Sequence, residues 1–296
     1  MAEAGEQTGH RWRTMLWTTL WLFAATFMGG LLTHQYWLGL VATAAVAGAS
    51  GLAGAASPRS GLIALFALVT FTVYLGGPDT AMSPWLAALL IAIGGLLQAT
   101  VMIGPYLITD PRIFIREFKR RPPFLPRVRA HLRWHDQYVD HAIRLSIAVT
   151  LATVLAHASG LQHQYWLPMT VAWVTQSGQL GTVRRVLSRI LGTFVGLLVV
   201  IAYIDGIGAQ GQWLVPLNAV AGGLAVLFIT SNYLISVIGT TTLIVTVLYM
   251  DGDKLSSTAP QRLGETIIAG IIAIAALAIW PDKKILPTDT SAPGPS

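Results

Sequence analysis

Arginines beside apolar segments are the residues of this sequence best suited to chemistry. Arg184, Arg185 and Arg189 open one apolar stretch, and Arg144 lies one helical turn inside another. A guanidinium group presents a planar fork of donors that matches a carboxylate, so these side chains are candidates for binding an organic anion. Alternatively, the first three only orient a membrane helix, and Arg144 extends along its helix to reach the interface.

Two further side chains complete the predicted solute pathway. Gln176 is a polar residue near the end of an apolar stretch, and Trp166 begins the same stretch. Aromatic residues at such positions usually anchor a helix among the lipid headgroups. The alternative is that Trp166 belongs to a vestibule for an aromatic or anionic solute.

Proton coupling and helix packing involve different residues. His163 and Glu265 are the coupling candidates, because no predicted span carries a carboxylate at its middle. Gly192 and Gly196 are four residues apart, so they form a notch on one helix face where another backbone can approach. We assign these glycines to helix packing and not to solute binding.

Several functional classes lack their motifs. The chain has no cysteine, no glycine-rich phosphate loop for ATP, and neither a nucleophile elbow nor a zinc-protease motif. We therefore expect no enzymatic activity, no catalytic residue, no cofactor, no metal site and no ATP binding. Transport, if active, would use an ion gradient or a partner ATPase.

The composition indicates a membrane protein. The 296 residues are 54% hydrophobic and only 11% charged, whereas soluble domains carry about 25% charged residues. A membrane helix needs about 20 apolar residues. The first apolar run continues past signal-peptide length, so we expect it to be retained. Ten spans are predicted, at 14–33, 36–56, 60–77, 84–105, 141–160, 164–181, 187–205, 212–229, 232–250 and 263–280.

The distribution of charge predicts the orientation. With ten spans and both termini cytoplasmic, sixteen of the nineteen lysines and arginines lie on the inner side. Lysine and arginine are retained on the cytoplasmic side during insertion. Only Lys254 and Arg262 fall on the outer side. The net charge of +6 therefore reflects membrane orientation and attraction to the lipid bilayer, and no nucleic-acid partner is needed to explain it.

An internal repeat organises the chain. The pentapeptide His-Gln-Tyr-Trp-Leu occurs at 34–38 and again at 163–167, each time between two apolar runs. Four predicted spans separate the copies, so both emerge on the outer face. The fold class predicted is therefore an all-α polytopic membrane protein with two parallel repeats of four and six spans.

The second repeat resembles a known family. After Trp166 come Pro168 and Thr170, then Thr182 with the paired arginines, and later Arg189-Ile-Leu-Gly-Thr-Phe-Val-Gly196. This pattern resembles the fusaric acid resistance family, which includes aromatic acid exporters. The resemblance covers about 139–282 well and 14–105 loosely. It implies export of small aromatic or other organic carboxylates by a secondary mechanism.

The domain boundaries follow from these observations. They are a cytoplasmic N-terminal segment 1–13, a first repeat 14–105, a basic linker 106–138, a second repeat 139–282 and a disordered tail 283–296. We expect a multi-pass protein of the bacterial cytoplasmic membrane, with a homodimer plausible because of its small-residue helix faces. Two alternatives to a transporter stay open: a passive anion channel on the same scaffold, and a non-transporting membrane scaffold or envelope-assembly protein.

Overall fold

The computed structural model describes residues 8–77, 82–109, 124–134, 136–160, 162–175 and 179–280. The predicted tail 283–296, most of the predicted N-terminal segment, the middle of the basic linker and Gln176 lie outside the described residues.

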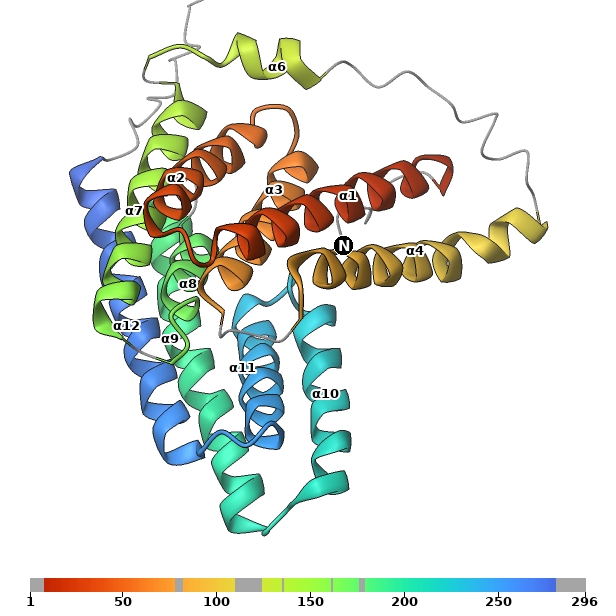
Figure 1. Ribbon diagram of the computed structural model, residues 1–296, viewed down its shortest axis with the longest axis vertical. Helices are drawn as coiled ribbons and strands as arrows, with labels where there is room; N and C mark the ends of the chain where they lie inside the picture. Colours follow the sequence, from red (N-terminus) through yellow and green to blue (C-terminus); the bar gives the residue numbers. More distant parts are fainter. Residues whose placement is uncertain are drawn as a thin grey trace, which may run out of the picture.

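The described part of the chain consists of helices joined by turns, with no strand (Figure 1). This confirms the all-α polytopic fold class. The helices are α1 (Thr8–Leu32), α2 (Tyr36–Ala53), α3 (Pro58–Gly76), α4 (Pro84–Thr109), α6 (Phe124–Ala130), α7 (Gln137–Ser159), α8 (Trp166–Val174), α9 (Gln179–Ile201), a π turn η1 (Ala202–Gly206), a 3-10 turn η2 (Gly211–Trp213), α10 (Leu214–Leu227), α11 (Tyr233–Met250) and α12 (Leu255–Ile279).

Local sequence signals explain where several helices begin and end. Ser57 accepts a hydrogen bond from the Ser60 amide at the start of α3, and Asp136 accepts one from the Tyr138 amide at the start of α7. Asn232 does the same at α11, at the predicted turn between two spans. Gly160 ends α7 with a left-handed φ of 61°, a conformation that favours glycine.

Eight helices in the described residues are long and apolar enough to cross a membrane: α1–α4, α7, α9, α11 and α12. They confirm a multi-pass membrane protein. The count of ten spans stays a prediction, because the other two predicted spans correspond to shorter helices. At 1.5 Å per residue, the 14 residues of α10 extend about 21 Å.

The predicted helix over 164–181 is wrong in its length. α8 has nine residues, about 14 Å, which is less than half of a hydrocarbon core of about 30 Å. The sequence explains why it ends: Thr175 turns its hydroxyl back onto the carbonyl of Val171, and the serine and glycine that follow Gln176 are poor helix formers.

The last span begins earlier than predicted. α12 begins at Leu255 and accommodates Pro260 within its first turns, whereas the hydropathy placed its start at 263. Glu265 therefore lies ten residues into the helix, about 15 Å along its axis. This early start carries Arg262 and Glu265 into the protein interior instead of leaving them at the outer end.

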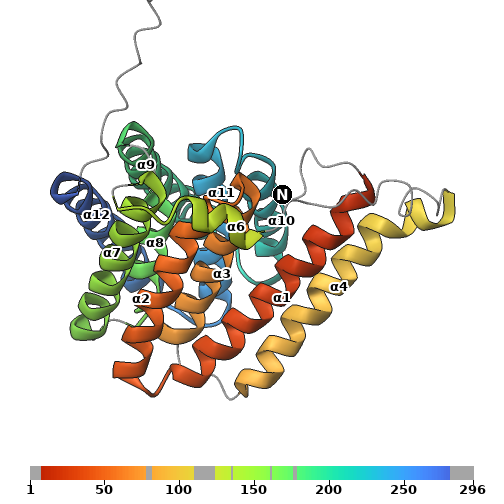
Figure 2. The ribbon, with the colours of Figure 1, turned by 90° about the horizontal axis from the view of Figure 1, so that it is seen from above.

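The first four helices form one part of the molecule. α1 packs between α3 and α4, and α2 packs on α3. Figures 1 and 2 show α1 and α4 side by side, steeply inclined to α9–α12. The two halves meet mainly along α2 and α7. Gly51 of α2 lies so close to α7 that a Cβ added to Gly51 would be 2.5 Å from the Cα of Ala142.

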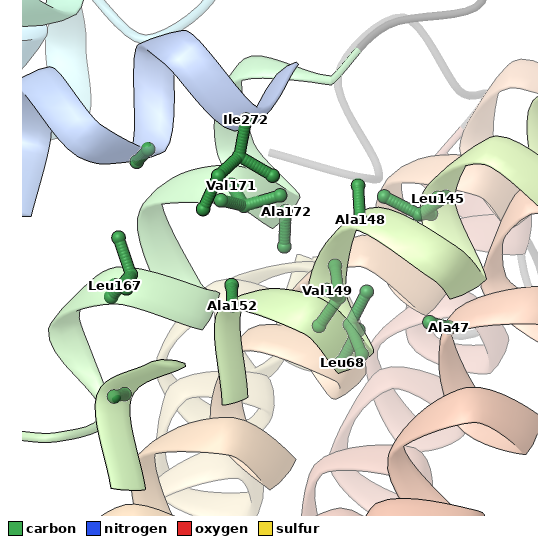
Figure 3. Close-up of a cluster of buried hydrophobic side chains, with 12 residues drawn as sticks. Ala47, Leu68, Leu145, Ala148, Val149, Ala152, Leu167, Val171, Ala172 and Ile272 are labelled. Atoms are coloured by element: carbon green, nitrogen blue, oxygen red, sulfur yellow. The ribbon is translucent and has the colours of Figure 1, made fainter. Parts of the chain in front are cut away.

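The second half surrounds the short helix α8. Helix α8 contacts α7, α12, α9 and also α3 of the first half, and eight of the nine residues of α8 are buried. The main hydrophobic core lies here: Leu68 of α3 and Val149 of α7 lie together, and Val171 of α8 faces Ile272 of α12 (Figure 3). Alanines fill much of this core, which lets the helices approach closely.

Cross-helix contacts define two ends of the bundle. Arg144 at the start of α7 reaches Trp280 at the end of α12, so α7 and α12 are antiparallel. The end of α9 packs on the start of α12, where Leu197 clusters with Leu255, and the turn before α12 meets the turn before α8. Consequently α7 and α9 run in the same direction, and the segment containing α8 returns the chain between them.

The charges are separated along this direction. Arg127 of α6 donates to the carbonyl of Ala56 in the α2–α3 turn, so the basic linker and that turn share one end. Asp253 lies at the other end with Gln162 and His163. This separation has the pattern that the positive-inside rule requires. Membrane sidedness itself stays a prediction, as do the duplication and the domain boundaries.

Candidate functional site

The candidate site is built around Trp166, the first residue of α8. Its side chain is 0% exposed, whereas the matching Trp37 of the first pentapeptide is 76% exposed. The interpretation of Trp166 as a headgroup anchor is therefore wrong, because α8 is enclosed by its neighbours. The two copies of the pentapeptide share a sequence but differ in surroundings, since α2 lies at the edge of the molecule.

Arg262 of α12 lies over the ring of Trp166. Its Cζ is 4.8 Å from the ring centroid, a distance at which a cation is attracted by the aromatic face. The side chain is 0% exposed. Among the described residues, none of its three guanidinium nitrogens has a hydrogen-bond partner. A buried charge without a hydrogen-bonded counterion is costly, so this arrangement needs a functional explanation.

The surroundings of Arg262 are rich in donors. Arg189 of α9, itself buried, and Glu265 both lie within electrostatic reach of it. Glu265 accepts a 2.8 Å hydrogen bond from Gln261 through Oε1 and not from Arg262. Three neighbours of Arg262 carry further buried atoms that have no hydrogen-bond partner in the described structure: Trp166 Nε1, Arg189 Nε and Glu265 Oε2. Most of these can donate, and a carboxylate accepts.

His163 closes this site toward the turn before α12. Its ring stacks on Trp166 with centroids 4.3 Å apart and an interplanar angle of 11°, and its Nε2 lies 3.1 Å from Oδ2 of Asp253. Burial lowers the pKa of His163, and the nearby Asp253 only partly offsets this effect. The neutral imidazole therefore predominates near neutral pH, and Arg262 and Arg189 remain the site's positive charges.

The predicted arginine mouth is divided by the structure. Arg184 is exposed, whereas Arg185 is partly buried and donates to the carbonyl of Trp173 at 3.3 Å. Arg185 also lies over the ring of Tyr233, 4.7 Å from its centroid. It thus satisfies a carbonyl at the C-terminal end of α8, where helix carbonyls lack intrahelical partners. Among the predicted arginines, Arg189 is the one that the structure brings to Arg262.

Arg144 lies at the opposite end of α12 from the site. Its Nη1 donates to the carbonyl of Trp280 at 3.1 Å, directly after the last residue of α12. The 18 residues between Arg262 and Trp280 correspond to about 27 Å along a helix. Arg144 therefore joins α7 to the end of α12, and it does not contribute to the cluster around Trp166.

We expect Arg144→Met to lower the stability of the protein instead of acting on solute binding alone. The change leaves the Trp280 carbonyl without its charged donor, and a hydrogen bond to a charged group contributes about 1.5–3 kcal/mol. Thermal unfolding of the purified protein in detergent measures this. An unchanged melting temperature together with lost transport would return Arg144 to the solute pathway.

Gly192 and Gly196 lie against α11. A Cβ on Gly192 would lie 2.8 Å from Val237 Cβ, and one on Gly196 would lie 2.9 Å from Thr241 Cβ. These two contacts hold α9 and α11 together.

Arg262 is the buried residue of this candidate site that the sequence-based assignment missed. A signal was present: with Lys254, it was one of two basic residues on the predicted outer side, against the orientation of the other charges. Membrane orientation does not explain an arginine that lies next to a span on the outer side, so its presence points to a partner or a site inside the protein. Hydropathy placed Arg262 in a loop, because a hydropathy average could not show that α12 begins at Leu255, seven residues before Arg262.

Comparison with known families identifies the region that contains the site. Residues 151–276 match the fusaric acid resistance protein-like family. The match spans α8, α9 and α12 up to residue 276, and thus Trp166, Arg189, Arg262 and Glu265. It confirms the resemblance carried by the second repeat.

Curated relatives also match part of this chain. The uncharacterized protein ORF2 of Neisseria gonorrhoeae is 30% identical over 170 residues, 56% of this chain and 40% of that protein. The uncharacterized protein YhfK of Escherichia coli is 30% identical over 187 residues, 60% of this chain and 26% of YhfK. The inner membrane protein YccS of Escherichia coli is 28% identical over 164 residues, 53% of this chain and 22% of YccS.

The chain spans less than half the length of these relatives. No solved structure matches it. The apolar helices, together with the inner-membrane relative, indicate a multi-pass protein of the bacterial inner membrane.

Proposed function

Residues 151–276 form a fusaric acid resistance protein-like segment, and on this basis we propose that the protein is a secondary transporter that exports small aromatic or other organic carboxylates. Arg262 binds the carboxylate, with Arg189 as the second positive charge. Trp166 supports the solute from the side of α8. An ion gradient supplies the energy.

One observation carries the proposal: the guanidinium group of Arg262 is fully buried and has no hydrogen-bond partner among the described residues. The free energy cost of such a group is offset when an anion binds it. A carboxylate accepts two parallel hydrogen bonds from a guanidinium fork, and the buried surroundings strengthen this interaction.

The neighbours of Arg262 favour an aromatic solute. Trp166 lies against the guanidinium, and Tyr165 and Tyr233 are within electrostatic reach of it. Burial raises the pKa of Tyr165, so its phenol stays protonated and can donate a hydrogen bond. Aromatic walls and a few placed donors are the usual make-up of a small-molecule site.

The burial of the site supports a transporter over an open channel. Arg262, Arg189 and Glu265 are each at most 3% exposed, so an anion bound there is closed off from both sides. Alternating access moves a solute through such an occluded state, with broken helices such as α8 at the binding site. A continuously open anion pore would instead expose its arginines to water.

Glu265 supports coupling to protons. It is buried one helical turn from Arg262, and its Oε2 has no hydrogen-bond partner among the described residues. A carboxylate next to a binding arginine competes with the solute for the positive charge. Protonation of Glu265 would therefore favour solute binding, which makes transport depend on pH. The inside-negative membrane potential, which drives an anion outward, supplies the energy for export.

Export of a panel of aromatic acids tests the proposal. Cells that produce the protein should accumulate less of at least one acid than cells without it, and an uncoupler should abolish the difference. Glu265→Gln should make export independent of pH while export itself persists, because glutamine cannot gain or release a proton. Equal accumulation of every acid would contradict the transporter. Ohmic anion current in a planar bilayer would instead support the channel.

A further inference from the structure

A cavity lies where the two pentapeptides meet. It has a volume of about 420 Å³, large enough for a small ligand. His34 and Tyr36 of the first pentapeptide and Gln164 of the second line it, together with Gln162 from the turn before α8. Residues 129 positions apart in the sequence therefore share one cavity. The anion-binding residues Arg189, Arg262 and Glu265 do not line it.

Close backbone contact brings the two pentapeptides together. A Cβ on Gly76, at the end of α3, would lie 3.2 Å from the backbone nitrogen of Tyr165, so the glycine helps α3 to approach the second pentapeptide closely. Tyr36 in turn stacks on His157 of α7, with ring centroids 4.4 Å apart and an interplanar angle of 29°. These two contacts connect the halves of the molecule on either side of the cavity.

The lining of this cavity combines apolar side chains with several polar groups and carries no permanent charge. Among the described residues that line it, amides, hydroxyls and imidazoles provide the polar atoms, and there is no arginine, lysine, aspartate or glutamate. The rings of Tyr36 and His157 provide a flat aromatic surface. A carboxylate would find no counterion here, whereas a planar ring bearing a hydroxyl group would find both a stacking surface and hydrogen-bond partners.

We propose that this cavity is a second binding site, separate from the buried arginines, for uncharged hydroxyaromatic molecules. The proposal goes beyond the transport function, because it requires neither an anion nor movement across the membrane. Gln162 connects the two sites: it lines the cavity, and its Nε2 donates to Oδ1 of Asp253 at 3.1 Å. Asp253 also contacts His163, which stacks on Trp166.

Binding of methyl 4-hydroxybenzoate to the full chain in lipid nanodiscs tests this proposal. The ester is uncharged and carries one hydroxyl group. Titration calorimetry, corrected with empty nanodiscs for partition into lipid, should show saturable binding. Gln164→Leu should weaken it about three- to tenfold, which corresponds to the loss of one neutral hydrogen bond. Tyr36→Leu, which removes the stacking surface, should weaken it by a similar factor.

Two comparisons separate this site from the arginine site. Gln212→Leu makes the same chemical change at an exposed glutamine that does not line the cavity, and it should leave ester binding unchanged. Arg262→Gln should leave ester binding unchanged but weaken binding of the 4-hydroxybenzoate anion. No saturable ester binding, or equal ester binding by wild type and both cavity variants, would overturn the proposal. Loss of ester binding in Arg262→Gln would also overturn it, because the ester would then occupy the arginine site.

Discussion

Arg262→Met is expected to make the protein more stable and unable to bind its acid. Methionine fills a similar volume without a charge. It removes the cost of burying a guanidinium that has no hydrogen-bond partner among the described residues, which is of the order of several kcal/mol per ion. Glu265 loses a positive neighbour in the variant, so we expect a net gain in stability smaller than that cost. Losing a hydrogen bond between charged groups costs about 1.5–3 kcal/mol, so acid binding should weaken by at least tenfold.

Thermal unfolding and acid titration of the same detergent-purified sample measure both effects. Arg129→Met is the matched control: it removes an exposed arginine on α6 and should change neither quantity, because an exposed guanidinium is already solvated. A lower melting temperature with normal acid binding would show that Arg262 holds the structure together and does not bind the solute.

Gly51→Val is expected to separate the two halves of the protein. A Cβ at this position would lie 2.5 Å from Cα of Ala142 and 3.0 Å from its nitrogen. Since these are backbone atoms of α7, no side-chain rotation relieves the clash. Overpacking a well-packed interior typically costs about 1–3 kcal/mol, occasionally more. The higher helix propensity of valine relative to glycine offsets only a few tenths of a kcal/mol of this cost.

Gly94→Val provides the comparison for this prediction. Gly94 lies in α4, where an added Cβ has no atom within 4 Å among the described residues, and it receives the identical side chain in a membrane helix. Its variant should unfold at the wild-type temperature or slightly above, whereas Gly51→Val should unfold lower or lose its folded fraction on size-exclusion chromatography. Equal unfolding temperatures for the two variants would show that α2 and α7 do not form the contact between the halves.

The membrane fold could be read from composition and hydropathy. Both depend on the transfer of side chains into lipid, which is a property of each segment by itself. The helix starts at Ser57, Asp136 and Asn232 were also readable, because a capping side chain acts on the amides next to it. The family resemblance likewise rested on local spacing, and residues 151–276 bear it out.

The candidate site could be predicted only in part. Trp166, Arg189, His163 and Glu265 were candidates from their residue types, and the structure places all four around Arg262. Arg144 was also a candidate, but it lies at the far end of α12. Spacing along the chain could not show that Arg144 lies apart from the other four candidates, because the distance between side chains on different helices depends on how the helices pack.

The sequence by itself determined that this protein crosses the membrane repeatedly, and it identified polar residues in apolar surroundings. Tertiary structure alone decided which of them meet. Hydropathy averages over a window and therefore placed Arg262 outside a span, while packing around α8 buries it against Trp166. Burial of one charge is a property of many neighbouring helices together, and for this reason only the folded chain reveals it.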